Sequence, residues 1–226
     1  MRKFLKRMTG IFLCVAMAAG IYGAIPAYAE GTDTGTDIQA QAAQWPTGPA
    51  VQAASAIIMD ASTGTVLYEK DADTPRYPAS ITKIMTTLLA LENCNLDEMV
   101  HFSATAVYEN EGGTSHIARD LDEEMTLEQC LYGIMLESAN ECSYAVAEHV
   151  GGGDYQKFID MMNAKAAELG CTNTHFNNCN GLPDPAHVVS ARDMALISRE
   201  AIKNSMFRKI VGTVRYEIPP TNKHAD

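Results

Sequence analysis

The sequence predicts a mixed α/β fold, and three observations support this prediction. Residues 55–60 and 65–69 are strand-like and flank a turn signal at 62–64, which predicts an antiparallel hairpin. The stretch after them carries apolar residues at helical spacing, and 211–218 is typical of one more strand before Pro219. Since a two-stranded sheet is marginal by itself, we expect an incomplete sheet that awaits further strands.

Five helices are predicted between the hairpin and the late strand. Residues 80–92 and 192–202 place apolar side chains at helical spacing. Thr126 and Gln129 have the spacing of a capping box, and Ser138 and Glu141 repeat that signature for the next helix.

The remaining helix is predicted between a capping Asp154 and a closing Gly170. It follows the glycine run 151–153, which ends the helix before it. Its apolar stripe is interpreted as core packing and consists of Tyr155, Phe158, Met162, Ala166 and Leu169.

The composition is globular and disfavours some classes of partner. The 226 residues are 46% hydrophobic and 20% charged, which argues against a disordered or fibrous chain. The formal net charge is −11, from 17 Lys and Arg against 28 Asp and Glu. Phosphates would repel so acidic a protein, so we expect neither nucleic acid nor an anionic membrane surface as its partner.

Residues 1–29 are predicted to be a secretory signal peptide. Four basic residues precede an apolar stretch at 10–25, and Ala27-Tyr28-Ala29 matches an A-x-A cleavage pattern. The alternative is a membrane anchor, but this stretch is short and interrupted by glycine and proline. We therefore expect an exported, extracytoplasmic protein with a flexible leader at 30–52 and an ordered domain at 53–226.

Five cysteines remain after the predicted cleavage: Cys94, Cys130, Cys142, Cys171 and Cys179. Five are too few for a disulfide scaffold, so a bridge between Cys171 and Cys179 and buried free thiols both stay open. These two cysteines and His175 match no standard zinc spacing. The sequence thus predicts no metal site and no cofactor.

Ser80 and Lys83 form the first candidate catalytic pair. Pro78 disfavours helix before it, which places Ser80 at a helix start. Lys83 is one turn further along the same face, so its neutral amine can take the serine proton as a general base. The alternative is that Ser80 only caps the helix and that Lys83 is a solvated base.

Ser138-Ala139-Asn140 is the second candidate segment, 58 residues after Ser80. The Ser138 hydroxyl can relay a proton from Lys83 to a leaving amine, and the Asn140 side chain can hold a substrate amide. The alternative is that Ser138 is only a helix cap.

Together these segments resemble the S-x-x-K and S-x-N motifs of penicillin-binding proteins and class A β-lactamases. Within that group the chain is similar to low-molecular-mass D-alanyl-D-alanine carboxypeptidases over about 55–222, including 79–86, 136–141, 174–182 and 187–195. The resemblance implies a serine β-lactamase/transpeptidase-like fold, an antiparallel sheet with helices on both faces.

The resemblance also implies a reaction and its partners. Ser80 would attack the terminal D-Ala-D-Ala bond of a peptidoglycan stem peptide, with Lys83 and Ser138 moving protons and Asn140 binding substrate. β-Lactams would inhibit by acylating Ser80. No cofactor or metal is implied.

One departure from the family pattern limits this reading. The third motif, Lys-Thr-Gly or Lys-Ser-Gly, is absent from the chain. We therefore expect a truncated catalytic domain, whose membrane association would rest on missing C-terminal residues. Two alternatives stay open: a non-catalytic peptidoglycan-binding relative, and a class A β-lactamase, disfavoured because 171–192 lacks glutamate and Ala139 replaces that class's aspartate.

Overall fold

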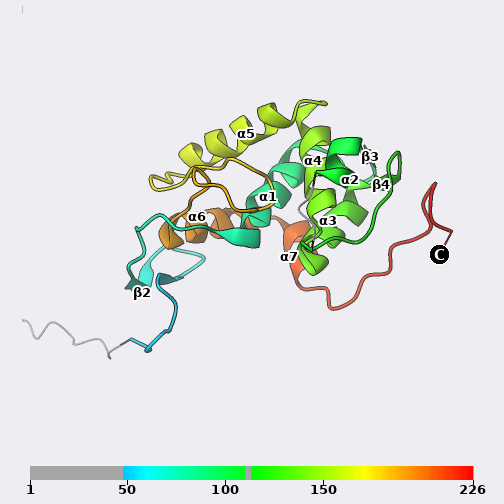
Figure 1. The fold of residues 1–226 in the computed structure, drawn as a ribbon. Helices are drawn as coiled ribbons and strands as arrows, with labels where there is room; N and C mark the ends of the chain where they lie inside the picture. Colours follow the sequence, from blue (N-terminus) through cyan, green and yellow to red (C-terminus); the bar gives the residue numbers. More distant parts are fainter. Residues whose placement is uncertain (1–47, 110–112, 226) are drawn as a thin grey trace, which may run out of the picture. The chain divides into compact units, whose positions relative to one another are not determined.

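A computed structural model describes residues 48–109 and 113–225 (Figure 1). The predicted signal peptide and most of the predicted leader lie outside the described residues. Thr47–Asp226 form one compact unit. Within its described part, no helix combines the length and the apolar character that crossing a membrane requires.

The predicted hairpin is confirmed. Strand β1 (Ala56–Met59) pairs antiparallel with β2 (Val66–Lys70). The Asp60 carboxylate shapes the turn, because it accepts hydrogen bonds from the backbone N–H of Ser62 at 3.0 Å and of Thr63 at 2.7 Å.

A second antiparallel pair was not predicted. Strands β3 (Met99–His101) and β4 (Glu124–Thr126) lie side by side, with Val100 opposite Met125. Three residues are too few to show an alternating pattern, so these strands carry little sequence signal.

The predicted helices are present with small changes at their ends. A 3₁₀ turn, η1 (Ala79–Thr82), leads into the first α-helix. The α-helices are α1 (Lys83–Asn93), α2 (Ala104–Tyr108), α3 (Leu127–Glu137), α4 (Asn140–Gly151), α5 (Tyr155–Glu168), α6 (Ala191–Ala201) and α7 (Ser205–Val211). The short helices α2 and α7 were not predicted. The capping box of Thr126 and Gln129 begins α3, and Asp154 caps α5, as the sequence predicted.

Helix α1 lies at the centre of the packing. It contacts α3, α4, α5 and α6, and Figure 1 shows it running between α5 and α6. One apolar cluster joins α1 to α5 and α6 through residues such as Met85, Phe158 and Ile197. A second cluster, around Phe102 and Leu131, joins α3 and α4 to the β3–β4 pair. Burial on several sides fixes α1, and with it the first residues of the helix.

The late strand predicted at 211–218 is wrong. Val211 ends α7, a short helix that Asn204 caps by accepting from the backbone N–H of Met206 and Phe207. The segment after Gly212 pairs with no strand in the described part of the chain. Its Tyr216 ring instead stacks on Tyr132 of α3 at a centroid distance of 3.8 Å. An alternating segment forms a strand only where a partner edge meets it.

The predicted cap at Ser138 is also wrong. Ser138 ends α3 in the left-handed region, at φ 57°, and the residue before α4 is Ala139, which makes no side-chain cap. The Glu141 carboxylate, which a capping box would turn back to the helix start, accepts from the backbone N–H of Ile117 at 2.6 Å. The contact from a distant loop overrides the local pattern.

Candidate active site

Ser80 lies on the exposed 3₁₀ turn η1, directly before α1. The preceding residue, Ala79, has φ 51°, a conformation that L-residues adopt at a cost. Gly181 explains how this turn is held: a Cβ atom built on Gly181 would lie 1.8 Å from the Ala79 carbonyl oxygen. The turn that carries Ser80 is therefore in close contact with a glycine of a distant loop. Ser80 does not cap α1, because Thr82 occupies that position.

Lys83 is the first residue of α1 and is only 2% exposed. Its Nζ donates to Asn140 Oδ1 at 2.7 Å and to the Asn180 carbonyl oxygen at 2.8 Å, and it lies 3.2 Å from Ser80 Oγ. Two positions on the amine are therefore taken by pure acceptors. The third faces the serine, so a neutral amine would direct its lone pair at the Ser80 hydroxyl. The alternative of a solvated base is wrong.

Burial lowers the pKa of Lys83 from its ordinary 10.5 to about 8, while the nearby Cys179 and Glu141 oppose that shift. At neutral pH roughly one lysine in ten would then carry a neutral amine. A lysine with this pKa can act as a general base near neutral pH.

The junction of α3 and α4 supplies the second part of the site. Asn140 begins α4, is 3% exposed, and is fixed by its backbone N–H donating to the Ser115 carbonyl at 3.0 Å. Ser138 Oγ is buried, and no partner for it exists among the described residues. A buried hydroxyl without a partner is costly, so this oxygen has capacity left for a ligand.

The loop 178–182 was missed by residue-level reasoning as a component of the site. Its Asn180 carbonyl holds the lysine, and the Asn178 side chain shapes the loop by accepting from the Gly181 N–H at 2.7 Å. Thr86 of α1 donates to the Cys179 carbonyl at 2.6 Å and ties the loop to the helix. The Asn-Gly pair was the available signal, because it marks a tight turn.

His187 connects the segment before this loop to the start of α1. It is 1% exposed, and its Nδ1 accepts from the backbone N–H of Asn177 at 2.9 Å. Nε2 must then carry the proton and donate to Thr82 Oγ1, 2.8 Å away. Burial lowers the pKa of His187 to about 4, so the ring stays neutral and positions the start of α1.

The structure thus brings Lys83 into contact with both Ser80 and Asn140. Ser138 lies two residues before Asn140, at the junction of α3 and α4. Within the described residues all five cysteines are free, including Cys171 and Cys179. The arrangement offers a hydroxyl nucleophile, a buried amine base and an amide.

Comparison with known proteins agrees with this geometry. The profile of the family described as D-alanyl-D-alanine carboxypeptidase matches residues 39–223. The D-alanyl-D-alanine carboxypeptidase DacF of Bacillus subtilis is 39% identical over 164 residues, which cover 72% of this chain and 42% of that protein. A D-alanyl-D-alanine carboxypeptidase of a Streptomyces strain is 35% identical over 92% of this chain and 68% of its own length.

Solved structures show the same likeness. The Streptomyces DD-transpeptidase superposes with a TM-score of 0.69 at 37% identity, covering 74% of this chain and 67% of that one. The carboxypeptidase DacD of Francisella tularensis gives a TM-score of 0.69 at 34% identity, covering 74% and 41%. The predicted fold class, mixed α/β and transpeptidase-like, is confirmed. This chain spans less than half of several of its relatives, and it belongs to the D-alanyl-D-alanine carboxypeptidase family.

Proposed function

We propose that the protein is a serine-type D-Ala-D-Ala carboxypeptidase that forms an acyl-enzyme on Ser80. The observation that supports this best is the buried amine of Lys83, which has two fixed acceptors and faces Ser80 Oγ at 3.2 Å. Such an amine has few uses other than exchanging a proton with the serine.

In the first step Ser80 Oγ attacks the carbonyl carbon of the penultimate D-Ala. The Oγ–H proton passes to Lys83 Nζ as the C–O bond forms, which gives a tetrahedral oxyanion. Asn140 has its side-chain oxygen on the lysine, so its amide nitrogen remains to bind a substrate carbonyl.

In the second step the C–N bond breaks and the terminal D-Ala leaves as an amine. The leaving nitrogen needs a proton, and Ser138 Oγ is proposed to relay it from Lys83, since the hydroxyl has no other partner among the described residues. Water then attacks the ester carbonyl while Lys83 takes its proton. Lys83 returns that proton to Ser80 Oγ as the ester C–O bond breaks, which restores the serine and the base.

The substrates are proposed to be peptidoglycan stem peptides ending in D-Ala-D-Ala, with β-lactams as inhibitors that acylate Ser80. Such a substrate lies outside the cytoplasmic membrane, in agreement with the predicted signal peptide. Residues 53–226 are proposed to act as part of the catalytic domain.

The test is the intact mass of the chain after incubation with benzylpenicillin, with the adduct mapped by digestion, alongside D-Ala release from a D-Ala-D-Ala peptide. A lasting adduct on Ser80, absent from Ser80→Ala, supports the proposal. Reversible peptide binding without an adduct or D-Ala release would identify a binding protein instead. Rapid turnover of penicillin would identify a β-lactamase.

A further inference from the structure

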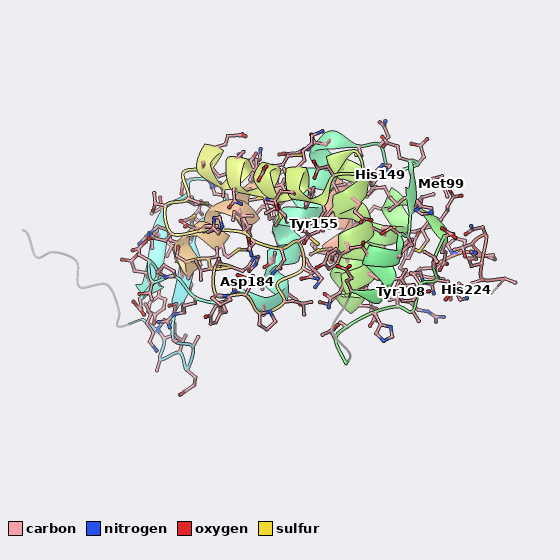
Figure 2. All side chains as sticks on the ribbon, turned by 45° about the horizontal axis from the view of Figure 1, so that its top comes forward. Met99, Tyr108, His149, Tyr155, Asp184 and His224 are labelled. Atoms are coloured by element: carbon pink, nitrogen blue, oxygen red, sulfur yellow. The ribbon has the colours of Figure 1, made fainter. Side chains whose placement is uncertain are left out.

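Three metal-ligating side chains meet at the end of the molecule where α1 and α4 terminate. Atoms of Cys94, Glu98 and His149 that can serve as ligands lie within 4.8 Å of one another. The three atoms are one sulfur, one carboxylate oxygen and one imidazole nitrogen. Figure 2 shows His149 close to Met99, the first residue of β3, at this end.

The three side chains are held by separate elements. Cys94 ends α1, with its backbone N–H on the Ala90 carbonyl, and His149 lies in the last turn of α4. Glu98 is oriented by Asn95, whose backbone N–H donates to Glu98 Oε1 at 2.6 Å. Its other oxygen, Oε2, is left facing His149 Nε2 at 2.9 Å. Such hydrogen bonding of a ligating carboxylate is the usual outer support of a metal ligand.

Solvent reaches this cluster. A cavity of about 450 Å³ lies on its His149 side: His149 lines it together with His101, Ser103 and Glu148, whereas Cys94 and Glu98 do not line it. Three protein ligands and one open position are the arrangement that zinc adopts where it is accessible.

We propose that Cys94, Glu98 and His149 form a three-ligand site for a zinc ion, with the fourth position open to the cavity. As an ion pair alone, Glu98 and His149 would contribute little, because their side chains are 35% and 23% exposed. The mixed sulfur, nitrogen and oxygen donor set suits zinc and disfavours magnesium or calcium. The sequence expectation of no metal site rested on other residues, and this spacing matches no standard pattern either.

The site would act on the same two helices that build the catalytic centre. Lys83 begins α1 and Asn140 begins α4, whereas Cys94 and His149 lie near the far ends of these helices. At 1.5 Å per residue the separations are about 16 Å and about 13 Å. The ion would therefore cross-link the C-terminal ends of α1 and α4 without contacting Ser80 or Lys83.

The test is a titration of the metal-free full chain with Co²⁺, followed by its displacement with Zn²⁺. One equivalent of Co²⁺ is expected to give a thiolate-to-cobalt charge-transfer band, and Zn²⁺ to remove it and to raise the melting temperature. Cys94→Ala should abolish the band, and Glu98→Gln and His149→Ala should weaken binding at least tenfold. Cys171→Ser, which changes another half-buried free thiol, should bind like the parent.

Circular dichroism of each metal-free variant controls for folding, and Glu98→Gln keeps the shape of the site if Cys94→Ala unfolds. The absence of a charge-transfer band in the parent would overturn the proposal. A band that persists in Cys94→Ala, or that Cys171→Ser removes, would overturn it as well. The result is independent of whether Ser80 is acylated.

Discussion

Two parts of the site differ in whether their hydroxyl and amine groups have hydrogen-bond partners, although the Asn180 side-chain nitrogen on the loop is also buried without one among the described residues. At the start of α1, the Lys83 amine, the Thr82 hydroxyl and the Thr86 hydroxyl all have hydrogen-bond partners on the segment 179–187. At the α3–α4 junction, the hydroxyl of Ser138 has none among the described residues.

The difference indicates two kinds of task. A general base must be held in place before the substrate arrives, because a poorly positioned base slows the reaction. A proton relay needs free bonding capacity, because it must accept from one partner and donate to another during the reaction. The start of α1 is thus held in place by the protein itself, whereas the junction keeps bonding capacity that a ligand can use.

The largest effect is expected from replacing Lys83, the proposed general base at the start of α1. Lys83→Gln keeps a polar side chain but cannot take the serine proton, so acylation by benzylpenicillin should slow by about 10²–10⁴-fold. Intact mass against time measures this rate. The control is Lys209→Gln, a change at an exposed lysine whose Nζ contacts Glu128.

The pH profile of the parent sharpens the same point. Only the neutral amine is a base, so the acylation rate should rise about tenfold per pH unit and level off above the Lys83 pKa of about 8. A flat profile, or parental acylation by Lys83→Gln, would show that another group takes the proton.

Acid should lower the free energy of unfolding through His187, which hydrogen-bonds Thr82 at the start of α1. Its pKa is about 4 when folded against 6.5 ordinarily, so between these values the unfolded chain binds the extra proton. Stability should therefore fall as the pH drops from 6.5 through 4, by up to about 3 kcal/mol. Urea unfolding at pH 7 and pH 4 measures this loss, and His187→Gln should remove its steepest part. An equal loss in both proteins would contradict the assignment.

The next prediction concerns the contact between Gly181 of the loop 178–182 and the turn that carries Ser80. Gly181→Ala places a methyl group against the Ala79 carbonyl, so the loop or the turn must move. Gly153→Ala is the matched control, because Gly153 also has a positive φ, 90°, but open space around its Cβ position. The control should lose about 1 kcal/mol of unfolding free energy, and Gly181→Ala should lose about 2 kcal/mol more. Gly181→Ala should also lose acylation by benzylpenicillin, whereas the control should keep it. Equal losses in the two variants would show that the contact is unimportant.

The part of the site that sequence reasoning could predict is the part that local geometry dictates. Ser80 and Lys83 are three residues apart on one helix start, so their contact follows from helical spacing. The Asn180 carbonyl reaches the same amine from 97 residues away, and nothing in the local sequence sets that distance. Its partner role depends on the packing of a loop, which only the tertiary structure determines.

The fold shows the same division. The hairpin and the capping box of Thr126 were predicted because turn and cap signals act within a few residues. The Ser138–Glu141 pattern is just as local, yet it does not form a capping box. The Glu141 carboxylate instead accepts a hydrogen bond from the Ile117 N–H. Where a tertiary hydrogen bond competes with a local signal, the local signal does not decide.

The smallest expected effect on stability lies at the α3–α4 junction, where two serines with buried hydroxyls differ in one hydrogen bond. Ser143 Oγ donates to the Ala139 carbonyl at 3.0 Å, whereas Ser138 Oγ has no described partner. Ser143→Ala should cost about 1 kcal/mol in urea unfolding, and Ser138→Ala should cost nothing or add stability, because it removes an unsatisfied hydroxyl.

Activity should reverse that order. Ser138→Ala should slow D-Ala release by about 10²-fold, the low end for a proton-transfer group, while Ser143→Ala should leave it within twofold of the parent. If Ser138→Ala instead destabilised the protein like Ser143→Ala and released D-Ala at the parental rate, the hydroxyl would be structural. A loss of activity without a loss of stability is the signature of a group that is kept for the substrate.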